Sequence, residues 1–105
     1  MNPLVNTKKE LIDLIVANSE QINLFGVQRI GIFGSFVRDE AQPESDIDFF
    51  VDIKSEMKTL GNFIELGEFL ENLTGRKVEL ITPQSLSKYI GPHILKEVEY
   101  VNFAA

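Results

Sequence analysis

Two aspartates separated by one residue are the part of this sequence best suited to chemistry. Asp46 and Asp48 begin a run, residues 46–53, in which every second position is apolar, namely Ile47, Phe49, Val51 and Ile53. Such alternation is typical of a strand with one buried face, which places both carboxylates on the opposite face. At a backbone separation of about 6 to 7 Å and an effective dielectric of about 20, the two charges repel by roughly 2 to 3 kcal/mol. We therefore expect a cation to bind between them.

The available ligands indicate which cation this is. The chain has no cysteine and one histidine, His93, which is distant in sequence and is interpreted as a surface or structural residue. Carboxylate oxygens favour a hard ion, Mg²⁺ or Mn²⁺. Glu79, in a predicted strand over residues 77–81, is a third candidate ligand if the two strands are neighbours in a suitable register, which the sequence leaves open. Asp52 shares the strand face but is expected to lie beyond the site, in solvent.

A candidate phosphate-binding turn follows residues 27–33, which are rich in branched side chains and predict another strand. Gly34 and Ser35 end this strand and open a short helix, so their N–H groups are suited to binding phosphate oxygens. The Ser35 hydroxyl adds a further donor. Arg38 follows one turn later, and its guanidinium could bind phosphate or pair with one of the aspartates. The sequence does not separate these two roles.

Helices are expected to position these strands by covering the apolar side of the sheet. One helix is predicted over residues 7–20 or slightly beyond, and a second over residues 60–73. Residues 38–45 lack periodicity and predict a loop. One or two short helices, interrupted at Gly91-Pro92, are expected within residues 83–98. The fold class predicted from these elements is α/β (α+β).

The aromatic residues are expected mainly in the core, as Phe36, Phe49, Phe63 and Phe69. Phe50 is the exception, because it shares a face with the aspartates and could flank a nucleotide. Tyr89 and Tyr100 are candidate contacts for a partner protein.

Length and charge limit the class of protein. The chain has 105 residues, 44% of them hydrophobic, which suits one domain spanning residues 1–105. With 16 acidic and 10 basic residues the net charge is -6, which disfavours direct binding to nucleic acid. The sequence contains no apolar run long enough to cross a membrane and no signal peptide pattern. We expect a soluble cytoplasmic protein.

The spacing of the two candidate sites resembles a known signature. Gly34-Ser35, ten further residues and then Asp46-x-Asp48 match the GS-x10-DxD pattern of the DNA polymerase β-like nucleotidyltransferase superfamily. Residues 31–38, 45–51, 75–82 and 94–97, in that order, are similar to the minimal nucleotidyltransferase (MNT) group. The resemblance implies a small mixed β-sheet flanked by helices. It also implies that Asp46, Asp48 and Glu79 are the catalytic metal ligands, and that Gly34 and Ser35 bind the triphosphate, with Arg38 as a further candidate.

The same resemblance implies an activity and a partner. Proteins of this group pair with HEPN-domain toxins, which are ribonucleases, and neutralise them by transferring AMP from ATP to a toxin tyrosine, so a hetero-oligomer is expected. Two departures favour an alternative, an antitoxin of weak or no activity that acts by binding alone. Glu79 replaces the usual aspartate, and Asp39 stands where glycine is common and adds negative charge beside the triphosphate. Transfer to a small molecule such as an aminoglycoside is disfavoured, because those enzymes carry an additional helical domain.

Overall fold

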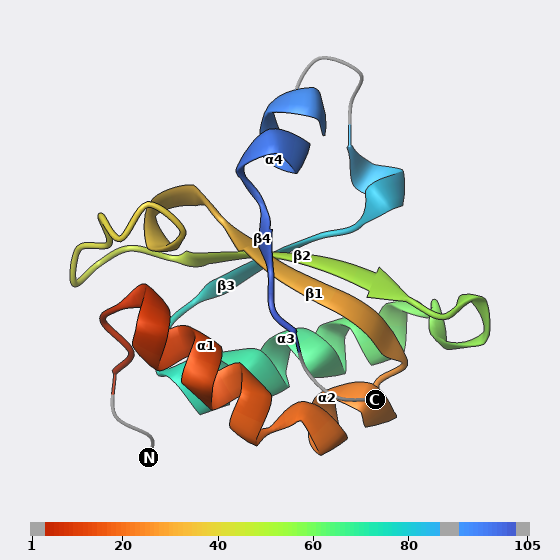
Figure 1. The fold of residues 1–105 in the computed structure, drawn as a ribbon. Coiled ribbons are helices and arrows are strands. Elements are labelled where there is room, and N and C mark those ends of the chain that lie inside the picture. The colour runs from red at the N-terminus through yellow and green to blue at the C-terminus, as the bar shows by residue number, and fades with distance from the viewer. Residues whose placement is uncertain (1–3, 87–90, 103–105) are drawn as a thin grey trace.

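Four strands form one mixed sheet in the order β3-β2-β1-β4 (Figure 1). The computed structural model describes residues 4–86 and 91–102. The strands are β1 (Val27–Phe33), β2 (Ile47–Ile53), β3 (Val78–Ile81) and β4 (Glu99–Tyr100). β1 is antiparallel to both β2 and β4, whereas β2 is parallel to β3. The predicted mixed sheet is therefore confirmed, and β4, which is too short to leave a pattern in the sequence, is an addition to it.

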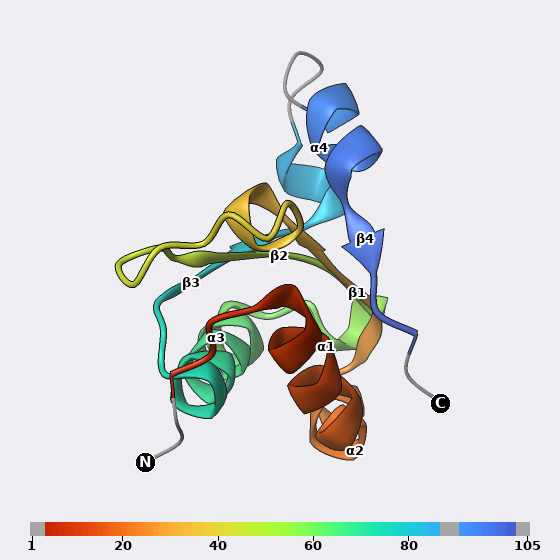
Figure 2. The ribbon, with the colours of Figure 1, turned by 60° about the vertical axis from the view of Figure 1, so that its left-hand side comes forward.

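Three helices cover one face of this sheet, and a fourth stands on the opposite side (Figures 1 and 2). The covering helices are α1 (Lys8–Ala17), α2 (Ser19–Leu24) and α3 (Leu60–Thr74), and the opposite one is α4 (Gly91–Glu97). Short 3-10 turns η1 (Gly34–Phe36), η2 (Ser55–Met57) and η3 (Pro83–Ser85) connect the elements. In the described part of the chain, no helix is long and apolar enough to cross a membrane.

The first predicted helix is broken into α1 and α2 at Asn18. The Asn18 side chain donates a hydrogen bond to the carbonyl oxygen of Leu14 at 2.9 Å, and its backbone N–H donates to the same carbonyl. Asparagine competes in this way with the next turn of a helix, so the chain changes direction here. The new direction places Ile22 of α2 in the core, where it is fully buried.

The predicted interruption at Gly91-Pro92 is instead the start of α4. Proline is tolerated in the first helical turn because its missing N–H would have no partner there. The first of the two expected short helices corresponds to the single turn η3. Residues 87–90, and with them the candidate partner contact Tyr89, lie outside the described residues.

The core lies between the sheet and the covering helices. The four predicted inward positions of β2, Ile47, Phe49, Val51 and Ile53, are all buried. Phe50 points to the other face but is only 1% exposed, with its ring 6.1 Å from that of Tyr100 in β4. The expectation that Phe50 flanks a nucleotide is therefore wrong, because β4 covers it. Phe36 is buried as expected, and Phe63 and Phe69 pack against the core from α3.

A buried arginine holds together the segments that lead into β2. Arg76 follows the left-handed Gly75 at the end of α3 and is only 6% exposed. Its guanidinium donates hydrogen bonds to the carbonyl oxygens of Val5, Gln42, Pro43 and Ser45 and to Oδ1 of Asn6, and it lies 4.9 Å above the Phe36 ring. These acceptors are neutral, so the ordering of the loop before Asp46 depends on one fork-shaped cation.

Replacement of this arginine is expected to destabilise the fold. Arg76→Lys keeps the charge but cannot reach carbonyl groups in several directions, which should lower the free energy of unfolding by about 3 kcal/mol. Urea denaturation measures this loss. Arg29→Lys is the matched control, because the Arg29 side chain is 54% exposed and should change stability by less than about 1 kcal/mol. Equal losses of unfolding free energy in the two variants would contradict this role of Arg76.

Candidate functional site

The carboxylates of Asp48 and Glu79 face each other across two parallel strands. In the β2–β3 ladder Asp48 is the direct partner of Glu79, so the two carboxylates lie next to each other on one face of the sheet. This is the register that the sequence left open, so the expectation that Glu79 lies on the same face is confirmed. Ile47 and Phe49, on either side of Asp48, are in the core with residues of α3, so Asp48 and its partner lie on the opposite face of the sheet, where Glu79 is exposed and Asp48 half-buried.

The acidic group consists of Asp46, Asp48 and Glu79. Asp46 lies just outside β2 and completes this group only in part. Its side chain is exposed, and it follows the loop that Arg76 clamps. The N–H of the next residue, Ile47, donates to the carbonyl oxygen of Lys77 at 3.0 Å, which aligns the start of β2 with β3. Over residues 4–86 and 91–102, no three Asp, Glu or His side chains are close enough to hold one metal ion together. The structure therefore brings together Asp48 and Glu79, with the exposed side chain of Asp46 beside them.

The pKa of the Asp48 carboxyl is raised to about 6. Burial of the carboxyl is the largest cause, followed by its interaction with Glu79 and by the negative charges of Asp46 and Glu97. All of these disfavour the ionised form. The repulsion expected between Asp46 and Asp48 is among these causes, but burial and Glu79 contribute more. Oxygen donors that repel each other fit a divalent cation, because its charge offsets the repulsion.

The glycine-serine turn lies directly against this pair. β1 and β2 are antiparallel, and Phe33 at the end of β1 pairs with Asp48 near the start of β2. Gly34 has φ +76°, and a Cβ at this position would overlap the Asp48 carboxylate. Glycine is therefore required twice, for its left-handed backbone and for the close approach. The ten residues between the two parts of the motif are the loop that returns the chain from β1 to β2.

Arg38 does not pair with either aspartate of the motif. Its Nε donates to Glu40 at 2.9 Å and its Nη1 to Glu97 at 2.7 Å. Glu97 also accepts a hydrogen bond from the Gly34 N–H. Sequence reasoning missed Glu97, although residues 94–97 belong to the family resemblance, because only the tertiary structure brings the end of α4 to the turn.

Asp39 points away from the acidic group. Its φ of +57° explains why glycine is common at this position. Its carboxylate accepts a hydrogen bond from the backbone N–H of Lys8 at 3.1 Å, in the first turn of α1, where a negative charge is favourable. The charge that was expected beside the triphosphate is therefore bound to a helix N-terminus instead.

Two other residues considered from the sequence lie away from the acidic group. Asp52 is further along β2, with its carboxylate 3.7 Å from the guanidinium of Arg29. It therefore lies beyond the site as expected, but in an ion pair rather than free in solvent. His93 is exposed on α4, as expected for a surface residue.

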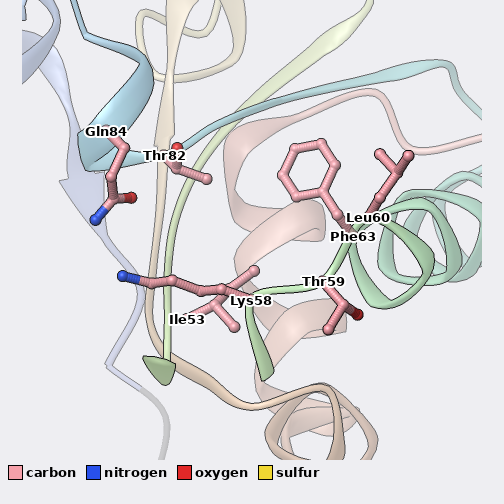
Figure 3. A pocket seen from close by; sticks show the side chains of 7 residues that line it. All are labelled: Ile53, Lys58, Thr59, Leu60, Phe63, Thr82 and Gln84. Carbon is pink, nitrogen blue, oxygen red and sulfur yellow. The ribbon is translucent and has the colours of Figure 1, made fainter. Parts of the chain in front are cut away.

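A hollow of about 390 Å³ lies beside Ile53, at the opposite end of β2 from Asp48 (Figure 3). Its walls are Ile53, Lys58, Thr59, Leu60, Phe63, Thr82 and Gln84. They come from the end of β2, the start of α3 and the segment after β3, and none is a residue of the motif. The acidic pair and the glycine-serine turn, on the open face of the sheet, remain the candidate active site.

Comparison with known proteins gives the family to which this geometry belongs. A model of the nucleotidyltransferase domain matches residues 12–101. This chain belongs to the nucleotidyltransferase domain family. Protein adenylyltransferase MntA of Thermococcus cleftensis is 43% identical over 96 residues, which cover 90% of this nucleotidyltransferase and 96% of that protein. A homologue of this type from Methanocaldococcus jannaschii is 31% identical over 96 residues, or 90% and 94% of the two chains.

Solved structures share the fold of this nucleotidyltransferase. One described as a minimal nucleotidyltransferase has a TM-score of 0.77 and 27% identity, covering 89% of this chain and 94% of that one. A chain from a toxin–antitoxin complex with AMP-PNP has a TM-score of 0.66 and 21% identity, covering 92% and 73%. A chain from a complex of a tri-AMPylated Shewanella oneidensis HEPN toxin with an MNT antitoxin has a TM-score of 0.58 and 20% identity, covering 92% and 70%. The last two similarities show the fold alone.

Replacing the turn glycine should strain the backbone and disturb the acidic pair. We expect Gly34→Ala to lower the free energy of unfolding by about 1 to 2 kcal/mol, since alanine disfavours positive φ. Chemical denaturation measures the loss. Gly61→Ala is the control, because Gly61 is exposed at the start of α3 with nothing within 4 Å of an added Cβ. It should stabilise the protein by roughly 0.5 kcal/mol, because alanine favours a helix. A neutral Gly34→Ala would contradict the close approach.

The raised pKa of Asp48 predicts a pH dependence of stability in the metal-free protein. The pKa is higher in the folded state, about 6, than the ordinary 3.8, so this group's contribution is full below pH 3.8 and is lost as the pH rises through 6. Asp48→Asn should therefore be more stable than the wild type at pH 7.5 in EDTA, by about 1 kcal/mol after solvent screening, and show less advantage at pH 4.5. Thermal unfolding at both pH values measures the difference. Asp52→Asn, which loses an attractive partner, should show no such gain.

Proposed function

We propose that this nucleotidyltransferase is an antitoxin that transfers AMP from ATP to a tyrosine hydroxyl of a partner HEPN-domain ribonuclease toxin. The observation that carries the proposal is the contact between the glycine-serine turn and the Asp48–Glu79 pair. The named activity of the 43% identical relative supports transfer of an adenylyl group to a protein. The complex of a tri-AMPylated HEPN toxin with an MNT antitoxin, which shares the fold, supports a HEPN toxin as the acceptor.

The three carboxylates of the motif are the proposed ligands for Mg²⁺ or Mn²⁺. Asp48 and Glu79 already face each other, and the exposed Asp46 side chain can turn toward them. A bound divalent ion would neutralise charge on the α-phosphate and lower the pKa of an attacking hydroxyl. The longer Glu79 side chain, which replaces the usual aspartate, still reaches Asp48, so it does not by itself argue against activity.

The turn and its neighbours are proposed to hold the triphosphate. Gly34 and Ser35 lie at the end of β1, where backbone N–H groups and a hydroxyl can bind phosphate oxygens. Arg38, one turn away, is proposed to contribute its guanidinium to the same phosphates. In the transfer, the acceptor oxygen bonds to the α-phosphorus, the bond from that phosphorus to the β-phosphate oxygen breaks, and pyrophosphate leaves.

The acceptor is proposed to come from the partner because the acidic pair lies on an open face. Glu79 is exposed, and the hollow at the far end of β2 is lined by neither residue of the pair. A tyrosine on a second protein can approach such a face, and a net charge of -6 favours a basic partner surface. The proposed assembly is therefore a hetero-oligomer in which this chain supplies the nucleotide site and the toxin supplies the hydroxyl.

An antitoxin that acts by binding alone is the second candidate. The observation that favours it is the position of Asp46, which leaves the acidic group short of three converging ligands in the described residues. The departure at Asp39 no longer supports it, because that carboxylate is bound to the N-terminus of α1.

A transfer assay separates the two candidates. The protein, labelled ATP, Mg²⁺ and the HEPN partner should yield AMP on a partner tyrosine, detected by mass spectrometry, and EDTA should abolish the product. Asp48→Asn should lower the rate by at least about 10³-fold, because it removes a charge on which phosphoryl transfer depends. Asp52→Asn, on the same strand face but paired with Arg29, is the matched control and should stay active. An unmodified toxin that is still neutralised, by wild type and Asp48→Asn alike, would favour binding alone.

A further inference from the structure

The end of α4 is joined to the glycine-serine turn by one side chain. Glu97, the last residue of α4, accepts a hydrogen bond from the Gly34 N–H at 2.5 Å through Oε1 and one from Arg38 Nη1 at 2.7 Å through Oε2. Its side chain is 34% exposed, less than those of Arg38 at 48% and Glu40 at 66%. Both oxygens are engaged and partly shielded from water, so the carboxylate has one defined orientation.

Glu97 restrains two parts of the proposed phosphate site at once. Gly34 is in the left-handed conformation, and Arg38 has a long side chain that would otherwise sample many rotamers. The other carboxylate on Arg38, Glu40, is largely exposed and is a weaker restraint. A cradle whose donors are already oriented binds its ligand without the loss of that conformational freedom.

The restraint leaves donors for a phosphate. The bonds from Arg38 use Nε and Nη1, and the planar guanidinium keeps its Nη2 amino group for another acceptor. Among the described residues, the hydrogen bonds of Ser35 involve its carbonyl oxygen, which accepts from Glu40 N–H at 2.8 Å, and not its hydroxyl. Glu97 therefore occupies the Gly34 N–H but leaves other donors of the turn and of Arg38 for the nucleotide.

The segment that carries Glu97 is anchored to β1 next to the turn. β4 follows α4 and pairs with Gly31 and Ile32. A Cβ on Gly31 would overlap the side chain of Val98, so glycine permits this close approach. Figure 2 shows α4 standing above the open face of the sheet, with β4 leading back down along β1. Position 97 is thus fixed relative to the turn both by the hydrogen bond of Glu97 to Gly34 and by the pairing of β4 with β1.

We propose that Glu97 is a positioning residue for nucleotide binding, which holds the Gly34 turn and Arg38 in the arrangement that receives the triphosphate. This inference rests on the proposed function, because it takes that turn as the triphosphate site. It makes α4 and β4, which carry none of the signature residues, part of the nucleotide site. The opposite possibility is that the carboxylate occupies the place of a phosphate and competes with ATP, and the two predict changes of opposite sign.

Nucleotide affinity in Glu97→Gln tests this assignment. Glutamine keeps the size of the side chain but loses the charge and presents an amide N–H₂ group toward Arg38. Titration calorimetry with Mg²⁺ and AMP-PNP should show a dissociation constant about tenfold higher than for the wild type. In the transfer assay the KM for ATP should rise by a similar factor while kcat changes less. Glu97→Asp, which keeps the charge with shorter reach, should recover part of the affinity and decides the matter if Glu97→Gln does not fold.

Two neighbouring glutamates provide matched controls. Glu40→Gln removes the other carboxylate on Arg38 without touching the turn, and Glu99→Gln removes a charge from the same segment, where Glu99 pairs with Lys8 at 3.0 Å. Both should keep the dissociation constant within about twofold, since exposed ion pairs contribute little. Unchanged or tighter binding by folded Glu97→Gln would overturn the proposal, and tighter binding would identify the carboxylate as a competitor. A wild type that binds no Mg²⁺–AMP-PNP would instead overturn the proposed function itself.

Discussion

Repulsion between carboxylates at the adjoining ends of β2 and β3 is the constraint on which the rest of this structure depends. Asp48 and Glu79 are direct partners in a parallel ladder, and burial together with the neighbouring charges raises the pKa of Asp48 to about 6. A protein that needed only stability would not place acids in this way. The arrangement is favourable once a divalent cation and a nucleotide's phosphates share the site.

The surrounding elements hold the repelling carboxylates of Asp48 and Glu79 in place. The antiparallel pairing of β1 with β2 brings the Gly34 turn against Asp48, and only a residue without a side chain fits there. Arg76 fastens the loop before Asp46 by donating hydrogen bonds to neutral carbonyl oxygens. Its positive charge therefore does not compete with a metal ion for the proposed carboxylate ligands. Glu97 reaches the same turn from α4 on the other side. Each support comes from a different part of the chain.

An open site of this kind suits an enzyme whose second substrate is another protein. The acidic pair lies on the face of the sheet opposite the core, with Glu79 exposed and Asp48 half-buried, and the hollow lies at the other end of β2. In the proposed function, the chain would supply a metal and phosphate site, and the partner would supply the acceptor and exclude water around it.

Local patterns in the sequence predicted the strands, the inward face of β2 and the glycine-serine turn, because strand alternation and turn residues are properties of neighbouring residues. Through the family resemblance of its motif spacing, the sequence also implied the mixed sheet and a site that joins the turn to Asp46 and Asp48. It did not determine the break at Asn18, the burial of Phe50 under β4, or the partners of Arg38, Asp39 and Arg76. The register that joins Glu79 to Asp48 and the contact of Glu97 with Gly34 were also decided only in three dimensions. The contact of Asp39 with Lys8 joins residues 31 positions apart and that of Glu97 with Gly34 residues 63 apart, and such contacts depend on how whole elements pack rather than on any local preference.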